Sequence, residues 1–166
     1  MPASDERGLR DWFLTWDFAH FVEVYDAISR CLRTSEDYEL IAYEFARDMA
    51  RRSTRYAEIT FTASTHYTNG VPFDTYFEGL RRGRERAREE FGVLMNWVFD
   101  IDRDSNDDLA DYTVDVAVEG MTEEVAALGL GGTEEDRPAR RYVRQFERTR
   151  AAGLHSLPHA GELDGP

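Results

Sequence analysis

The sequence predicts an α/β fold with about four parallel strands and flanking helices, and three observations support this prediction. After an N-terminal helical segment, short apolar stretches alternate with helical patterns. One apolar stretch is nearly unbroken, which is typical of a strand buried on both faces of a parallel sheet. Each stretch also ends in a polar or glycine-containing cluster. Helices between successive strands imply right-handed parallel βαβ units. The candidate strands are residues 56–62, 93–99, 125–130 and 154–159.

Composition excludes several classes of protein. The 166 residues suit one domain, and 42% hydrophobic residues with ten Phe, eight Tyr and three Trp support a packed core. The formal net charge of −13 disfavours nucleic acid and anionic membrane surfaces as partners. A single cysteine, Cys31, excludes an internal disulfide and a cysteine-based zinc cluster. No apolar run reaches 18 residues and the N-terminus lacks a signal-peptide core, so we expect a cytoplasmic protein without a transmembrane helix.

The first helical segment is predicted over residues 9–32, with a break near Asp17. Its apolar residues recur mostly at three- and four-residue intervals, and we interpret this stripe as core. The stripe comprises Phe13, Trp16, Phe18, Phe21, Val24, Tyr25 and Ile28. Thr34 as N-cap, with Asp37 three residues later, predicts a second helix ending near Arg52. The apolar residues expected to be buried by this helix are Leu40, Ile41, Tyr43, Phe45 and Met49.

The strand at 56–62 is rich in β-branched and aromatic residues and is followed by a polar loop at 63–66. Glu58 would need a buried partner if it faced the core. His66 could line a pocket, but we expect a solvated loop histidine. An Asn-Gly turn then leads to a helix over 73–91. Its mixed acidic and basic residues indicate a solvent-exposed face, which argues against nucleic-acid binding.

The second half repeats the strand–helix pattern. The strand at 93–99 is followed by an acidic cluster without EF-hand spacing, which we interpret as a solvated loop or helix cap. That cluster is Asp100, Asp102 and Asp104. A helix over 107–120 leads to the strand at 125–130, and Gly131-Gly132 after it could be simply a tight turn. Pro138 begins the helix that precedes the last strand.

The last strand carries the residues best suited to chemistry. Alternate strand positions share a face, so His155, Leu157 and His159 point the same way. Two histidines four residues apart could share a metal on a helix, but Pro158 argues against a helix here. In a strand they lie roughly 13 Å apart and cannot share one ion. His159 is therefore the candidate metal ligand, and His155 an inward-facing or supporting residue. Glu162 could carry protons for a metal-bound water, although such residues are more often structural.

Three segments resemble the adenosine deaminase family of metal-dependent TIM-barrel enzymes: HAGE at 159–162, ALGLGGTE around Gly132, and YAEITFTASTH at 56–66. The resemblance implies a partial TIM (β/α)8 barrel, one Zn²⁺ ion and a small purine nucleoside substrate that loses ammonia by hydrolysis. It implies that His159 binds zinc, that Glu162 protonates the purine ring nitrogen, and that Gly132 contacts the substrate. The GGxE and PHAGE variants are similar to the aminodeoxyfutalosine deaminase branch.

The resemblance covers nearly the whole chain but corresponds to only the second to fifth strands of the eight-stranded barrel. We therefore expect residues 1–166 to form a single partial domain with an N-terminal helical segment. The family's first strand carries a His-x-His pair that binds the metal, and these residues contain no such pair. Its later strands supply a further histidine and an Asp-Asp pair. The chain is predicted to be a fragment of a deaminase that could self-associate through open sheet edges. The alternative is a catalytically inert truncated or partner piece.

Overall fold

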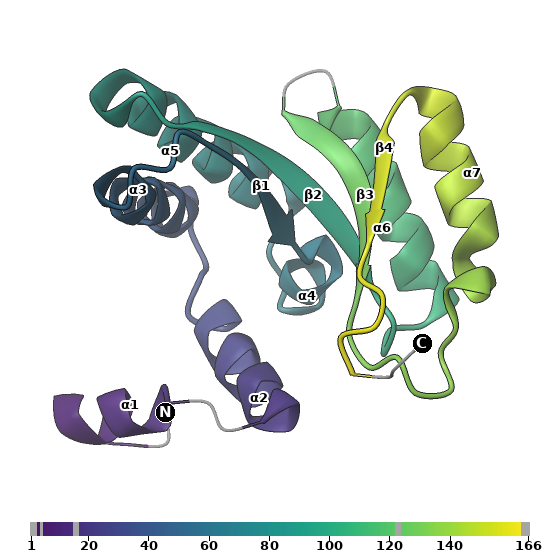
Figure 1. Cartoon of the computed structure of the whole chain (residues 1–166), viewed down its shortest axis with the longest axis horizontal. Coiled ribbons are helices and arrows are strands. Elements are labelled where there is room, and N and C mark those ends of the chain that lie inside the picture. The colour runs from purple at the N-terminus through teal and green to yellow at the C-terminus, as the bar shows by residue number, and fades with distance from the viewer. Residues whose placement is uncertain (1–2, 4, 15–16, 122–123, 164–166) are drawn as a thin grey trace. The chain divides into compact units, whose positions relative to one another are not determined.

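A sheet of four parallel strands organises the structure, in the order β1-β2-β3-β4 (Figure 1). The strands are β1 (Tyr56–Phe61), β2 (Leu94–Asp102), β3 (Val125–Gly131) and β4 (His155–Pro158). Consecutive strands are neighbours, and each pair is parallel. The predicted α/β class with about four parallel strands is confirmed.

The computed structural model describes residues 3, 5–14, 17–121 and 124–163. Residues 1–33 and 34–166 form two compact units, so the division falls at the end of the predicted N-terminal helical segment. The assignment of residues 1–166 to a single partial domain stays a prediction. In the described part of the chain, no helix combines the length and the apolar character needed to cross a membrane.

The first unit contains helices α1 (Glu6–Trp12) and α2 (Phe18–Ser29). The break predicted near Asp17 is confirmed, because the Asp17 side chain caps α2 by accepting from the amide of His20 at 2.9 Å. The predicted aromatic core is wrong in part: Val24 is buried, but Phe13, Phe21 and Ile28 are exposed. Two short helices offer too little surface to bury a whole aromatic face. Trp16 lies outside the described residues.

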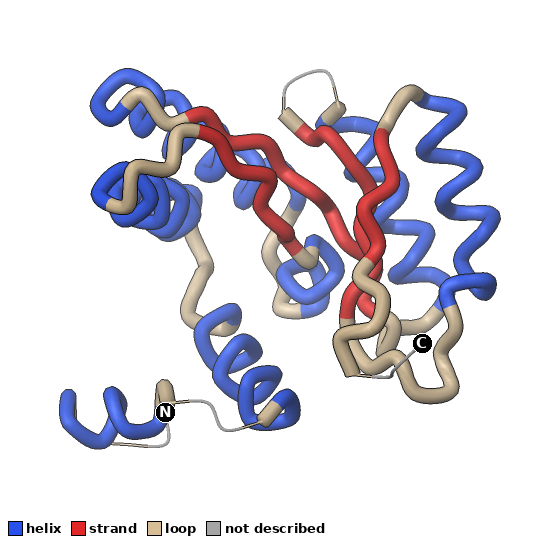
Figure 2. Tube along the Cα trace, viewed as in Figure 1, coloured by secondary structure: helices blue, strands red, loops and turns tan. Residues whose placement is uncertain are grey.

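The second unit adds one helix before β1 and further helices between the strands (Figure 2). They are α3 (Ser35–Arg51), α4 (Ala63–Thr68), α5 (Phe73–Phe91), α6 (Asp107–Gly120), the 3₁₀ helix η1 (Ala139–Tyr142) and α7 (Val143–Ala152). The predicted bounds of α5 and α6 are confirmed. The polar loop predicted at 63–66 is wrong, because these residues begin α4. Ala63, Ser64 and His66 are buried in that helix, so tertiary packing stabilises it although no side chain caps its N-terminus.

The two faces of the sheet have different surroundings. On β2 the side chains of Met95, Trp97, Phe99 and Ile101 are buried, and Phe99 packs against Phe77 of α5. The opposite side we call the inner face. It carries Glu58, paired in register with Asn96, and large exposed apolar side chains at Tyr56 (51%), Leu94 (47%) and Leu157 (42%). Glu58 is itself exposed and accepts a hydrogen bond from the Tyr56 hydroxyl at 2.7 Å, so no buried partner is needed.

Helix α3 begins as predicted but buries a different face. Thr34 and Asp37 form a complete capping box. The buried side chains are Tyr38, Ala42, Ala46 and Met49, whereas Leu40, Ile41 and Phe45 are exposed and Tyr43 is half-buried. The predicted burial is therefore correct for Met49 and wrong for Leu40, Ile41 and Phe45.

The buried face of α3 is selected by two glycines on α5. A Cβ at Gly79 would lie 2.2 Å from the Ser35 carbonyl oxygen and 2.7 Å from the Cβ of Tyr38. A Cβ at Gly83 would lie 2.6 Å from the Glu39 carbonyl oxygen. The absence of side chains lets the two backbones approach closely, so this contact uses small residues and leaves the larger aliphatic side chains outside it.

Replacing Gly79 by alanine should destabilise the second unit by about 2–3 kcal/mol, because the added methyl group meets backbone atoms that cannot rotate away. The clash opposes the gain of up to about 1 kcal/mol that alanine normally brings to a helix interior. Urea unfolding measures the difference, with Arg88→Ala on the exposed side of the same helix as control. A Gly79→Ala chain as stable as the wild type would contradict this packing.

Candidate active site

The loops after β2, β3 and β4 lie side by side at one edge of the sheet. Parallel strands place all their carboxyl ends together, where α/β enzymes build their sites. Hydrogen bonds extend the ladder beyond the strands: the amide of Arg103 donates to Gly131 O, and that of His159 donates to Leu130 O, both at 2.9 Å. The polar clusters predicted separately from the sequence are thus assembled on one edge.

His159 and Glu162 face each other directly after β4. The distance from His159 Nδ1 to Glu162 Oε2 is 3.4 Å, and the two side chains are 42% and 44% exposed. A carboxylate at this distance favours an imidazole with its proton on Nδ1, which leaves Nε2 able to bind a cation. His155 lies four residues earlier, at the beginning of β4, where it is paired with Ala127 and exposed.

Gly132 is required by the backbone itself. Its φ of +88° lies in the left-handed region that favours glycine. A Cβ would also lie 2.8 Å from Asp102 Oδ1 and 3.2 Å from Asp104 Oδ2. The next residue, Thr133, donates to Asp104 Oδ2 through its hydroxyl at 3.0 Å. The glycine therefore has a local structural cause in addition to the substrate contact that the sequence suggests.

Asp100 is a residue that the sequence prediction misplaced. It was expected in a solvated acidic loop, but β2 continues through Asp102, so Asp100 lies within the strand and is only 5% exposed. Burial raises the pKa of Asp100 to about 6, while the Thr62 hydroxyl and His159 act in the opposite direction. Space for the carboxylate comes from Gly131, where a Cβ would lie 2.7 Å from Asp100 Oδ2. The feature of the sequence that could have indicated this burial is the Gly-x-Gly spacing of Gly129 and Gly131 on β3.

The other two aspartates are occupied by local contacts. Asp102 accepts from the amide of Asp104 at 2.8 Å, and Asp104 forms an ion pair with Arg137 at 2.8 Å. Within the described residues, no three His, Cys, Asp or Glu side chains gather closely enough to hold a metal ion. A catalytic zinc needs about three protein ligands. The described part of this chain offers His159 alone, so its residues do not complete a zinc site.

His66 was predicted to be a solvated loop residue, and this prediction is wrong. Helix α4 turns the side chain inward, where it is 2% exposed. Its Nδ1 lies 2.8 Å from the hydroxyl of Tyr38, and its ring stacks on Phe61 with the centroids 4.6 Å apart. Burial lowers the pKa of His66 to about 4, so the ring is neutral at physiological pH. Its place is structural, beneath the carboxyl end of β1.

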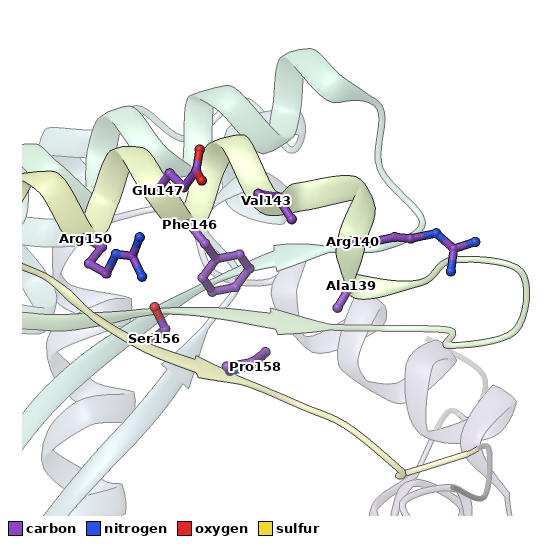
Figure 3. A pocket seen from close by; sticks show the side chains of 8 residues that line it. All are labelled: Ala139, Arg140, Val143, Phe146, Glu147, Arg150, Ser156 and Pro158. Carbon is purple, nitrogen blue, oxygen red and sulfur yellow. The ribbon is translucent and has the colours of Figure 1, made fainter.

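A cavity of about 410 Å³ lies between α7 and β4 (Figure 3). Ser156 and Pro158 line it from the side of β4 that is opposite the inner face. Phe146 extends into it from α7, and Arg140, Glu147 and Arg150 surround it. It opens beside β4, which is an edge strand of the described sheet, and the candidate catalytic residues do not line it.

A parallel βα sheet with its polar residues at the carboxyl edge is the arrangement of part of a (β/α)8 barrel. The family model for adenosine deaminase matches residues 1–166. The chain therefore belongs to the adenosine deaminase family, and the predicted resemblance is confirmed.

Three proteins illustrate the relationship. The chain is 39% identical to the aminodeoxyfutalosine deaminase of Streptomyces coelicolor over 98% of this chain and 43% of that protein. It matches the crystal structure of adenine deaminase from Arthrobacter aurescens with a TM-score of 0.90 and 27% identity, over 99% of this chain and 50% of the other. An amidohydrolase from Burkholderia ambifaria with bound Zn matches with a TM-score of 0.81 and 30% identity, over 85% of this chain and 39% of that one. The chain thus spans half or less of the length of these relatives.

Stability should depend on pH through His66. Because its pKa falls from 6.5 to about 4 on folding, the unfolded chain binds more protons between these values. The free energy of unfolding therefore has its full value above pH 6.5 and decreases as the pH falls to 4. The decrease is roughly 3 kcal/mol, at about 1.4 kcal/mol per pH unit. Urea unfolding of wild type and His66→Gln at several pH values isolates this effect. A difference between them that stays constant from pH 7 to pH 4 would contradict it.

Proposed function

We propose that this chain forms the part of a purine deaminase that carries the proton-transfer residue and one side of the substrate pocket. The observation that carries the proposal is the pairing of His159 with Glu162 at 3.4 Å, on the same edge of the sheet as the Gly132 loop. In the reaction, water adds its oxygen to the ring carbon bearing the amine, and ammonia leaves. This activity belongs to the proposal for the full-length enzyme.

Glu162 is proposed as the group that donates a proton to the purine ring nitrogen. Its exposed carboxyl group can reach a ligand at this edge, and proton transfer from a positioned acid gives large rate gains. Gly132 allows the backbone to approach a flat ring closely, because no side chain stands between them. These two roles require that the loops after β3 and β4 keep a fixed relative position.

His159 is proposed as one ligand of a Zn²⁺ ion in the full-length enzyme. The similar Burkholderia amidohydrolase contains bound Zn, and an exposed imidazole beside a carboxylate is a suitable donor. When bound, such an ion lowers the pKa of a coordinated water and so supplies the nucleophile. The other ligands would have to come from outside the described residues, because no matching set of side chains gathers within them.

The substrate is proposed to be a purine nucleoside derivative of the aminodeoxyfutalosine type. The Streptomyces coelicolor aminodeoxyfutalosine deaminase is 39% identical to this chain, and the Arthrobacter adenine deaminase is 27% identical. The exposed single cysteine, Cys31, is compatible with the reducing cytoplasm, where we place the enzyme.

Changing Glu162 to Gln in the full-length enzyme should lower kcat about 10²–10⁴-fold, because an amide has a similar shape but donates no acid proton. Steady-state deamination of the nucleoside, followed by absorbance, measures this loss. Glu147→Gln, on the exposed face of α7, serves as the matched control and should leave kcat unchanged. An unchanged kcat in Glu162→Gln would remove Glu162 from the mechanism.

The metal assignment is tested on the same enzyme. His159→Ala should lose zinc together with activity, while His155→Ala on the same strand and face should retain the ion. Metal analysis after gel filtration compares the two variants. Full zinc occupancy in His159→Ala would transfer the role to another residue.

The 166-residue chain alone is proposed to be inactive and to self-associate. The chain is expected to be inactive because its described residues offer one candidate zinc ligand. It is expected to self-associate because the sheet has two edge strands and exposes apolar side chains at Tyr56, Leu94 and Leu157. Light scattering and a deamination assay with added zinc test both statements. A stable monomer at high concentration, or turnover at enzyme-like rates, would contradict them.

A further inference from the structure

A buried ion pair lies beneath the loop formed by residues 159–163. Arg103 follows β2 and Glu134 follows β3, and their side chains are only 3% and 10% exposed. The distance from Arg103 Nη2 to Glu134 Oε1 is 3.7 Å. A charge buried at this depth is unfavourable without a partner, so each residue needs the other.

Arg103 holds the beginning of the loop and a neighbouring segment together. Its Nη2 donates to the carbonyl oxygen of His159 at 2.8 Å, and its Nη1 donates to that of Arg137 at 2.6 Å. The Tyr142 hydroxyl in turn donates to the carbonyl oxygen of Arg103 at 3.2 Å. The planar guanidinium, with donors in several directions, suits this bridging position.

Glu134 holds the loop on both sides of Glu162. Its Oε1 accepts from the amide of Gly161 and its Oε2 accepts from the amide of Leu163, each at 2.9 Å. Gly161 has a φ of +74°, which turns the backbone so that both amides can meet one carboxylate. The residue between the two bound amides is the proposed proton donor.

Apart from the bond from the His159 amide to Leu130 O and the contact of His159 with Glu162, the loop has little else to order it. Its residues from His159 to Leu163 are all exposed, so apolar burial contributes little. Hydrogen bonds to charged groups are stronger and more directional than neutral ones. The conformation of the loop therefore depends mainly on the Arg103–Glu134 pair.

We propose that Arg103 and Glu134 are positioning residues that fix the loop at 159–163 and thereby set where His159 and Glu162 act. The catalytic part of this inference rests on the proposed function, because it assumes that Glu162 is the proton donor. The structural part, that the pair orders the loop, concerns the 166-residue chain itself. Two experiments address the two parts separately.

The first experiment measures hydrogen–deuterium exchange in the 166-residue chain. Arg103→Gln and Glu134→Gln should speed exchange at Gly161 and Leu163 at least about tenfold, because the charged partner of these amides is lost or left unbalanced. Arg103→Lys keeps the charge but loses the fork that reaches two carbonyl oxygens, so it should give an intermediate increase. Slow exchange at the buried β3 residue Leu128 serves as the check that each variant is folded.

The matched control is Arg137→Gln. It breaks the neighbouring Arg137–Asp104 ion pair at 2.8 Å but leaves the carbonyl oxygen of residue 137 in place. Exchange at Gly161 and Leu163 should stay within about twofold of wild type. Unchanged exchange in both Arg103→Gln and Glu134→Gln would overturn the inference. An equal rise in the control and throughout β3 would overturn it as well, since that result indicates general loosening.

The second experiment measures kinetics of the full-length enzyme with Glu134→Gln and Arg103→Lys. Displacing the proton donor should lower kcat about 10–100-fold while KM changes less than about twofold, because Gly132 itself is unchanged and Thr133 keeps its own bond to Asp104. A merely structural role would lower the fraction of active enzyme and leave kcat per active site unchanged, whereas a displaced Glu162 lowers kcat per active site. Normal kcat with accelerated loop exchange would refute the positioning role. Absence of deamination in the wild type would refute the proposed function, and the exchange data would still decide whether the pair orders the loop.

Discussion

Parallel pairing of the strands is the constraint on which the structure depends. It brings the carboxyl ends of β2, β3 and β4 to one edge, and it aligns Asp100 with Gly129 and Leu157 across the inner face. Close pairing at that edge requires small residues, because a Cβ at Gly131 would collide with the Asp100 carboxylate. The glycines of β3 therefore allow the strands to pair closely, and they also leave room for polar groups beside the candidate site.

The packing of the helices also depends on small residues. Gly79 and Gly83 allow α5 to contact the backbone of α3, and the cluster of Tyr38, Phe61 and His66 fills the space below the carboxyl end of β1. The candidate catalytic loop, by contrast, is exposed and has few apolar contacts. Its order comes from charged groups at the ends of the neighbouring strands. The molecule thus separates a rigid packed layer from a polar edge that is held by a small number of strong directional bonds.

Membership in the adenosine deaminase family explains why the site looks incomplete. The chain spans 43% of the aminodeoxyfutalosine deaminase and 50% of the adenine deaminase structure that it resembles. A barrel site collects residues from the ends of many strands, so a segment with four strands holds a subset of them. The proposed proton-transfer loop and the Arg103–Glu134 pair fall within this subset, and the hydrogen bonds between them lie inside the chain.

The sequence by itself determined the four parallel strands, the capping of α3 by Thr34 and Asp37, and the proximity of His159 and Glu162, because these follow from local periodicity, local hydrogen bonding and short motifs. Tertiary structure decided the rest. The buried face of α3, the inward turn of His66 and the burial of Asp100 depend on which surfaces meet, and residues far apart in the chain control that. The Arg103–Glu134 pair is the clearest case, since its members and the loop they hold come from three different strand ends. Glu134 stands in the GGxE motif, but the motif does not indicate that Glu134 is buried against Arg103 or that it holds another loop, so only the folded chain reveals this pair.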